Sequence, residues 1–512
     1  MTNEAYEAWL DAMPVDDVRG RIKRLEHKLS DLQLLARLYA VRQPNGPEAA
    51  PTPGGPTARK TSCEPTGPQQ GSIAAQSCPA LAFNIGPPIK VMVVDVERCP
   101  VEILVEHPDG GRYQGVWLLT RVGGEPRSLI RLPFVGDRIT RADLAPQLRA
   151  LTLDGRMASR LTLPESPPQI SVVVCTMFER GEELRRCLES LAALDYPAFE
   201  VLVVDNRRDE DGRSVDWVER IPRVRLLRER RPGVAAAKNR GLNAAAGAIV
   251  AFTDDDVVVD RGWLTAFARR FCAHPEEVGV GGLTLPKELE TEAQIRLEEY
   301  YGSMGPRIME PVSHRLERPR GRGLFRKAIV AERNDEGEIV DSFSLYSPTR
   351  FGGGVNMAFR TETLRATGGF DVLLGPGTPT RGGEDIILWM RLAWRGYSLG
   401  FEPAALVFHV HRREDEQLQR QISNNGVGFA ATMVAIVADD PRHLGALVAA
   451  APQVLSALGR SFWKKLQTQT PPQTTLAATS SVSDLARLEL RGMLTGPAAY
   501  FRSRRRARQW RS

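Results

Sequence analysis

Two groups of acidic residues are the strongest candidates for chemistry in this chain. Asp254, Asp255 and Asp256 directly follow the apolar stretch 248–253, and Glu384-Asp385 follows two glycines about 130 residues later. Three adjacent carboxylates at the end of a buried strand repel one another unless positive charge neutralises them. A divalent cation that also bridges a diphosphate provides that charge and accepts oxygen ligands. The pattern therefore indicates a metal clamp and a separate basic carboxylate, as group transfer from a nucleotide-activated donor requires.

Other kinds of phosphate site are not indicated by the sequence. No G-x-x-x-x-G-K-[ST] motif occurs, and the glycines at 279, 281 and 282 have the wrong spacing for a dinucleotide-binding loop. A phosphate cradle built from backbone N–H groups is thus disfavoured. Metal-mediated binding at the acidic triplet is the remaining interpretation.

The elements that would position these acids alternate between strands and helices from residue 169 onward. Continuously apolar strands alternating with amphipathic helices predict a parallel sheet with helices on both faces, with ligands at the carboxyl ends of the strands. Those ends carry Thr176, Asp205 and the acidic triplet. The predicted strands are 170–175, 199–204, 224–227 and 249–252, and the predicted helices are 181–193, 234–246, 263–271 and 385–395.

Seven short motifs in a fixed order add a family resemblance. Residues 168–411 resemble the bacterial family 2 glycosyltransferases, which have the GT-A fold. The resemblance is to non-processive members, because no Gln-x-x-Arg-Trp motif follows Asp385. The resemblance implies an α/β fold with a Rossmann-like, mixed, mainly parallel sheet and helices on both faces. The motifs are VVVCT at 172–176, VVDN at 203–206, GVAAAKNRG at 233–241, FTDDD at 252–256, GGGVNMAFR at 352–360, GGFD at 368–371 and GED at 383–385.

The resemblance also implies roles for individual residues. Asp254 and Asp256 would form a D-x-D pair that holds Mn²⁺ or Mg²⁺. One histidine of the pair His409 and His411, which would point to the same side of an extended segment, would complete the metal shell, and His411 is assigned this role. Asp385 would be the general base that takes a proton from an acceptor hydroxyl, with Glu384 touching the acceptor. The donor is expected to be a nucleoside diphosphate sugar, UDP-linked by preference. It would contact Thr176, Glu179, Asp205, Lys238, Arg240, Asp254, Asp255, Gly353, Gly354 and Asn356.

Each of these residues also has a structural interpretation. Asp205 and Glu384-Asp385 suit helix caps, because a helix N-terminus stabilises acids. Lys238 and Arg240 suit a solvated helix face, and lone histidines such as His411 are usually structural. One departure from the family pattern puts the base contacts in doubt: members often have Pro-Thr-Tyr-Asn where this chain has Cys-Thr-Met-Phe at 175–178.

Two other functional classes compete with glycosyl transfer. A non-catalytic scaffold or binding module would keep the fold without needing every acid, yet all of them are present. A nucleotidyltransferase would also hold a metal with acids, but it usually has a basic glycine-rich loop after the first strand. Here that loop has no glycine before Gly181.

The segments outside the resemblance predict accessory regions. Apolar residues from Val15 to Tyr39 recur at 3–4 spacing, as in a coiled coil that would make a homodimer or in one amphipathic helix docked on its own chain. The proline-rich stretch that follows predicts a disordered linker. The predicted regions are a coiled-coil helix at 1–42, a linker at 43–88, a small β-rich module at 89–165, the GT-A domain at 166–413 and C-terminal helices with a basic tail at 414–512.

Charge and hydropathy limit the partners and the location. The net charge of +6 is concentrated in the last residues, so the chain is not expected to bind nucleic acid. The tail either stays solvated or contacts an anionic membrane surface, which would suit a lipid-linked acceptor as an alternative to a glycan or a small molecule. Without a secretory signal, a membrane span or paired cysteine spacing, the sequence predicts a cytoplasmic protein, or one at the inner face of the cell membrane.

Overall fold

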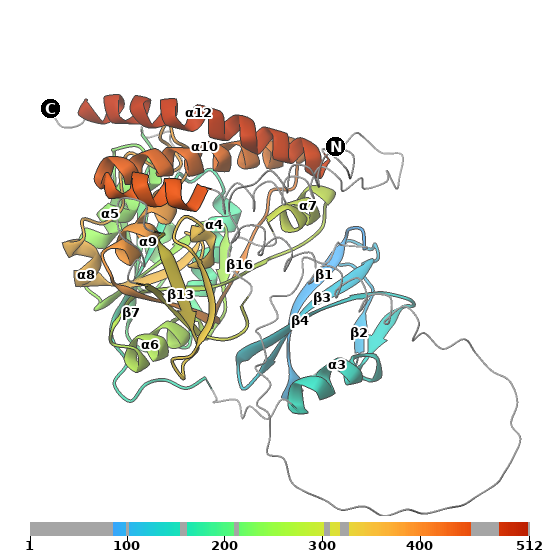
Figure 1. Ribbon diagram of the computed structural model, residues 1–512. Coiled ribbons are helices and arrows are strands. Elements are labelled where there is room, and N and C mark those ends of the chain that lie inside the picture. Colours follow the sequence, from blue (N-terminus) through green and yellow to red (C-terminus); the bar gives the residue numbers. More distant parts are fainter. Residues whose placement is uncertain are drawn as a thin grey trace, which may run out of the picture. The chain divides into compact units, whose positions relative to one another are not determined.

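The computed structural model describes seven ranges of the chain (Figure 1). The predicted coiled coil at 1–42 and nearly all of the linker at 43–88 lie outside the described residues, so both stay predictions. Residues 510–512 of the basic tail also lie outside them. The described ranges are 85–98, 102–153, 161–208, 215–301, 308–317, 327–451 and 481–509.

A single large mixed sheet forms the centre of the domain that carries the candidate acids. Its strand order is β14-β13-β12-β16-β11-β15-β9-β6-β7-β8, and β10 also pairs with β16. Pairing is parallel across β9, β6, β7 and β8 and between β11 and β16. The strands are β6 (Ile170–Thr176), β7 (Phe199–Asp205), β8 (Val224–Arg228), β9 (Ile249–Asp254), β10 (Val257–Val259), β11 (Glu277–Pro286), β12 (Val312–Leu316), β13 (Ile329–Arg333), β14 (Ile339–Ser344), β15 (Asn356–Arg360) and β16 (Ser398–His409).

Helices cover both faces of this sheet, which confirms the predicted α/β architecture. On β6, Val173 packs in one apolar core, whereas Val172 and Val174 pack in another. The first core includes residues of α5, α9 and α10, and the second includes residues of α4 and α6. Burial on both faces explains why these strands are apolar throughout. The helices are α3 (Arg141–Leu153), α4 (Gly181–Ala192), α5 (Val234–Ala244), α6 (Trp263–Ala273), α7 (Glu292–Tyr301), α8 (Thr361–Ala366), α9 (Glu384–Trp394), α10 (Asp415–Asp439) and α12 (Val482–Arg508).

The antiparallel part of the sheet was not predicted from the sequence. Strands β12, β13 and β14 extend it beyond β16, each antiparallel to its neighbour. The polar side chains His314 and Glu332 are buried there and hydrogen-bond each other at 3.1 Å. Such strands lack a continuous apolar run, which is why periodicity alone did not reveal them.

Strands β1 to β5 lie within the range predicted as a β-rich module, and they pack against the large sheet. Leu119 shares an apolar core with Leu283 and Phe401, and Arg121 donates to Asp260 at 2.8 Å. Strands β1 to β5 and the large sheet therefore share this apolar core. Its strands are β1 (Ile89–Asp95), β2 (Glu102–Leu104), β3 (Gly115–Val122), β4 (Glu125–Pro133) and β5 (Arg138–Thr140).

The C-terminal helix is longer than the sequence predicts. C-terminal helices followed by a basic tail were predicted, whereas most of that tail is itself helical: α12 continues through Pro497 to Arg508. Glycines allow α12 to lie against α10: a Cβ atom on Gly492 would be 2.2 Å from the Ser423 carbonyl oxygen, and one on Gly426 would be 2.2 Å from that of Glu489. Among the described residues, no helix is both long and apolar enough to span a bilayer.

We predict that Gly492→Ala lowers the free energy of unfolding by about 1–3 kcal/mol, because α10 and α12 must separate to admit the methyl group. This loss exceeds the gain of about 1 kcal/mol that alanine normally brings to a helix interior. Chemical denaturation measures the difference. Gly136→Ala is the control, since a Cβ atom there meets nothing within 4 Å; equal stability of the two variants would contradict the close packing.

Candidate functional site

Strand register brings the predicted strand-end residues to one edge of the sheet. Thr176 at the end of β6 pairs with Asp205 at the end of β7, and Cys175 pairs with Asp254 at the end of β9. Parallel strands present their carboxyl ends at the same edge, so these polar residues lie side by side. The expectation drawn from alternating strands and helices is confirmed at this point.

Arg180 supplies positive charge to the acidic triplet. Its guanidinium lies 2.9 Å from Asp255 Oδ1 and forms a second ion pair with Asp256. The Thr176 hydroxyl donates to Asp255 Oδ2 at 2.7 Å. Asp255 is therefore held by protein groups on both carboxylate oxygens.

His409 is the histidine that lies beside the triplet. The short strand β10 pairs with the end of β16, and Val257 faces His409 across this ladder. His409 Nε2 is 3.4 Å from Asp256 Oδ1, which is within ion-pair distance. The same carboxylate oxygen has no hydrogen bond among the described residues. The predicted metal ligand His411 contacts Glu298 and His409: its Nε2 lies 2.6 Å from Glu298 Oε1, and its Nδ1 lies 3.0 Å from His409 Nδ1.

Burial and charge shift the pKa values of the triplet in opposite directions. Burial, together with the neighbouring acids, raises the pKa of Asp254 to about 6, although Lys238 opposes the shift. Burial also acts to raise the pKa of Asp256, but His409 and Arg180 outweigh it and the net pKa is well below the ordinary value. Two neighbouring carboxylates thus differ in how readily they ionise, as expected where repelling acids share few counter-charges.

The second acidic pair begins helix α9. Gly383 precedes it in the left-handed region, with φ of 96°. Asp385 Oδ2 accepts a hydrogen bond from the Gly354 backbone N–H at 2.8 Å. A Cβ atom on Gly354 would be 2.7 Å from this same oxygen, so only glycine permits the approach. The glycine run that the sequence associated with the site thus fixes the orientation of Asp385.

Lys238 connects the two acidic groups. Its ammonium lies 3.1 Å from Glu384 Oε1, and both side chains are more than nine-tenths buried. Burial alone lowers the pKa of Lys238, but the charges of Glu384, Asp254 and Asp385 raise it, and the net pKa lies above its ordinary value. Because one ammonium interacts with all three carboxylates, residues from β9 and α9 converge here.

Asp205 is held by two arginines. Arg207 donates through Nε and Nη2, the latter at 2.8 Å, and Arg228 forms a second ion pair. Although burial opposes ionisation, these interactions lower the pKa of Asp205. The neighbouring Asn206 anchors the approach to α5: its side chain accepts from the Gly233 N–H at 3.1 Å. A ring N–H of a nucleotide base would compete with the arginines for Asp205.

Three predicted donor contacts do not lie where the prediction needs them. Asn356 is fully buried, and its amide bonds the Trp263 indole and the Leu283 and Ala405 carbonyls. It therefore joins strands instead of bordering a ligand. Arg240 is exposed on α5, away from its buried neighbour Lys238, and Glu179 is exposed before α4. For Arg240, the solvated helix face is the interpretation that fits.

The chemistry of the free carboxylate oxygens fits a divalent cation. Asp256 Oδ1 is buried without a hydrogen bond among the described residues. Among the described residues, no group of three or more His, Cys, Asp or Glu forms a ready-made metal cage. Magnesium-type sites of one or two carboxylates completed by substrate phosphates and water need no such cage.

Sequence reasoning missed Arg180, Arg207 and Arg228 as parts of the site, and of the candidate pair His409 and His411 it assigned the metal shell to His411. Arginines were overlooked because nothing in their spacing distinguishes them from surface residues. A usable signal was their position: Arg180 and Arg207 follow the strand ends of β6 and β7 within four residues. For His409, the usable signal was its position at the end of β16. Only the pairing of β10 with β16 shows that His409, and not His411, lies beside the triplet.

Comparison with known proteins gives several similarities. Residues 171–332 match the family model described as Glycosyl transferase family 2. The chain is 28% identical over 302 residues to the pre-mycofactocin glycosyltransferase of Mycobacterium tuberculosis, covering 57% of this chain and 55% of that protein. It is 31% identical over 140 residues to the glucosyl-dolichyl phosphate glucuronosyltransferase of Haloferax volcanii, covering 27% and 45%. The chain thus spans about half the length of the curated relatives it matches.

Among solved structures, the mannosyltransferase PcManGT from Pyrobaculum calidifontis in complex with GDP-Man and Mn²⁺ is similar over 70% of this chain and 93% of that chain. Its TM-score is 0.38 and its sequence identity is 19%.

We predict that Lys238→Met lowers the free energy of unfolding by about 3 kcal/mol or more, because Glu384 would keep a buried charge without its partner or have to take up a proton. Urea denaturation measures the change. The matched control is Arg240→Met, two residues away on the exposed side of α5, which should change stability by less than about 0.5 kcal/mol. Equal effects of the two variants would show that Lys238 is not the charge that holds Glu384.

Proposed function

The domain that begins at β6 belongs to glycosyl transferase family 2, and we propose that it is a metal-dependent, inverting glycosyltransferase. The donor would be a nucleoside diphosphate sugar, with UDP-sugars the first to test. The acceptor would be a hydroxyl of a glycan, a lipid-linked molecule or a small molecule. The observation that carries the proposal is Lys238, whose charge interacts with Asp254 of one acidic group and with Glu384 and Asp385 of the other.

Donor binding would use the strand-end edge of the sheet. Thr176 and Asp205 lie at neighbouring strand ends and would border the base and ribose. Asp254 and Asp256 would hold Mn²⁺ or Mg²⁺, and the buried Asp256 Oδ1, which no described residue hydrogen-bonds, supports this assignment. When bound, the cation would stabilise negative charge on the departing diphosphate. Arg180 and His409 would keep the remaining acid charge balanced.

Asp385 would act as the general base. Its Oδ2 is oriented by the Gly354 N–H and its Oδ1 by the N–H of Ile386, so the carboxylate has little rotational freedom. It would accept the proton of the acceptor hydroxyl while that oxygen bonds to the anomeric carbon. The bond from this carbon to the diphosphate oxygen would break on the opposite side, and the nucleoside diphosphate would leave with the electron pair. One displacement of this kind inverts the anomeric configuration.

Metal dependence is tested at the triplet. We predict that EDTA stops transfer from a UDP-sugar, that added Mn²⁺ restores it, and that Asp256→Ala reduces the Mn²⁺-dependent rate by about 100-fold or more, as loss of several kcal/mol of charge stabilisation would. The exposed Asp137→Asn is the control. Full activity of the Asp256 variant, or full activity in EDTA, would contradict the proposed metal site.

The base is tested by Asp385→Asn, which keeps the shape of the side chain and removes its ability to accept a proton. We predict that this variant binds UDP in calorimetry with nearly wild-type affinity, while its transfer rate falls by about 100-fold to 10,000-fold. Glu182→Gln, an acid in the first turn of α4, is the matched control for loss of a helix N-terminal charge. Transfer at the wild-type rate would remove the base assignment. If wild-type protein binds no nucleotide and transfers no sugar, the scaffold interpretation replaces the enzyme.

A further inference from the structure

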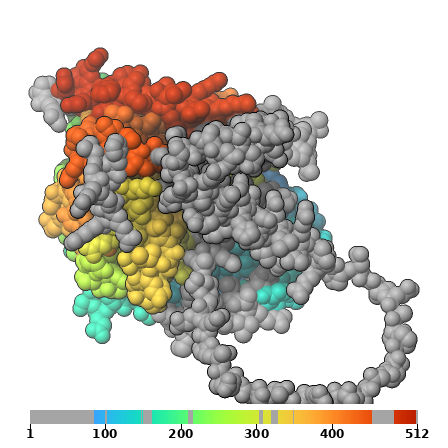
Figure 2. All heavy atoms as spheres, in the orientation of Figure 1, coloured from blue at the N-terminus to red at the C-terminus, as the bar shows by residue number. Residues whose placement is uncertain are grey.

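The outer face of α12 exposes large apolar side chains in a line. Leu490, Leu494 and Phe501 recur at helical spacing on the side opposite the residues that pack on α10. Leu494 is 76% exposed and Phe501 is 59% exposed. From Leu490 to Phe501, a span of twelve residues, this stripe is about 16 Å long. Figure 2 shows α12 (red) at the surface next to α10 (orange).

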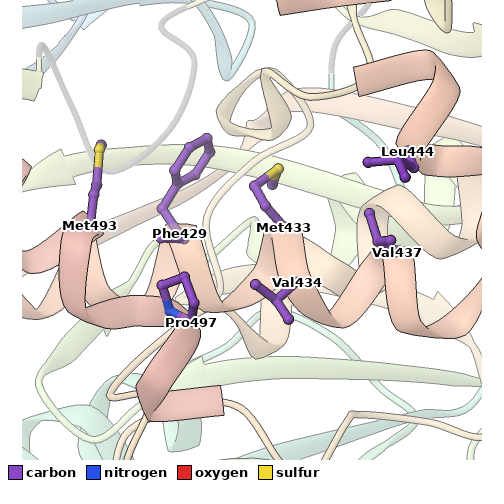
Figure 3. A pocket seen from close by; sticks show the side chains of 8 residues that line it. Phe429, Met433, Val434, Val437, Leu444, Met493 and Pro497 are labelled. Carbon is purple, nitrogen blue, oxygen red and sulfur yellow. The ribbon is translucent and has the colours of Figure 1, made fainter. Parts of the chain in front are cut away.

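An apolar groove lies beside this stripe, between α10 and α12. Its volume is about 460 Å³, and the eight side chains that line it are all apolar. Met433 and Val437 of α10 lie on one side and Pro497 of α12 on the other, with Leu444 at one end (Figure 3). Leu444 and Val448, on the helical stretch 442–451, are also exposed, at 56% and 50%. The stripe and the groove together form an apolar surface of the kind that marks an interaction site.

Positive charge borders the apolar stripe. α12 contains seven arginines, all exposed, and only two acids. Both acids are already engaged: Asp484 caps the helix and pairs with Arg487, and Glu489 accepts a hydrogen bond from Tyr300 at 2.5 Å. Among the described residues, no acid pairs with the other arginines. They are Arg491, Arg502, Arg504, Arg505, Arg506 and Arg508.

We propose that this apolar and basic face of α12 binds the surface of an anionic lipid bilayer. A helix with a lengthwise apolar stripe and arginines beside it is suited to lie in the interfacial plane, with its apolar side chains among the acyl chains and its guanidinium groups at the headgroups. The occupant is identified by charge: an excess of exposed arginines beside exposed leucine and phenylalanine matches a negatively charged apolar surface. The proposal does not depend on the glycosyltransferase assignment.

The test is flotation of the full-length protein with vesicles of phosphatidylcholine alone or mixed with phosphatidylglycerol. We predict binding to the anionic vesicles that is at least about 10-fold tighter than to the neutral ones and that weakens as salt is raised. Leu494→Gln and the double variant Arg502→Gln/Arg505→Gln should each weaken binding to anionic vesicles by roughly 10-fold. All of these side chains are exposed, so the thermal stability of the variants should match that of the wild type.

Two control variants replace an exposed apolar side chain and an exposed arginine by glutamine at positions outside α12. Val135→Gln replaces a side chain that is 96% exposed, and Arg261→Gln replaces an exposed arginine on another surface; neither should change vesicle binding. Absence of binding, equal binding to both kinds of vesicle, or variants that bind like the wild type would each overturn the proposal. A lipid-free dimer that Leu494→Gln converts to a monomer would also overturn it, because the face would then belong to a second copy of the chain.

Discussion

Crowding of five carboxylates, three of them buried and two half-buried, in one region of the fold is the constraint on which the rest of the site depends. Asp254, Asp255 and Asp256 come from the end of β9 and the turn after it, and Glu384 and Asp385 come from the start of α9. Acids so close together, taken out of water, fold stably only where positive charge and hydrogen bonds compensate. Lys238, Arg180 and His409 provide that charge, and each arises from a different element. Strand register and helix packing are therefore coupled to charge balance, since displacing any one element leaves a carboxylate unpaired.

The three counter-charges differ in their accessibility, and this difference suggests how the site can accept a ligand. Lys238 and His409 are almost fully buried, so they are fixed parts of the protein. The Arg180 side chain is 31% exposed. Arg180 is therefore the cation that we expect to move when another positive charge reaches the triplet, and a guanidinium released in this way is suited to contact a phosphate.

The opposite side of the site is more rigid: a Cβ atom on Gly383 would be 2.1 Å from the Thr432 hydroxyl of α10. Helix α10, against which α12 lies, thus also supports the glycines in front of Asp385.

Much of the fold followed from the sequence, whereas the site was predicted only in part. Continuous apolar runs identified β6, β7, β8 and β9 to within two residues, because strands buried on both faces have little choice of composition. The antiparallel strands β12 to β14 and the full length of α12 were missed, since their boundaries depend on tertiary pairing and on glycines such as Gly492. Strand ends predicted that Thr176, Asp205 and Asp254 share one edge of the sheet, and the strand register places them there. Asn356 was misread because a motif position does not tell which way a side chain faces, and His411 was chosen over His409 because both have the same parity on a strand. The arginines escaped notice because only the folded chain shows which acids they meet.

The most direct test of the central claim is the thermodynamic coupling between Mn²⁺ and UDP, measured by calorimetry of each ligand with and without the other. If the acids of β9 hold the cation at the diphosphate, Mn²⁺ should tighten UDP binding by about 10-fold or more, UDP should tighten Mn²⁺ binding by the same factor, and Asp254→Asn should remove most of this coupling. The same UDP affinity with and without Mn²⁺ in the wild-type protein would contradict the account, because the buried acids would then have no shared cation with a donor.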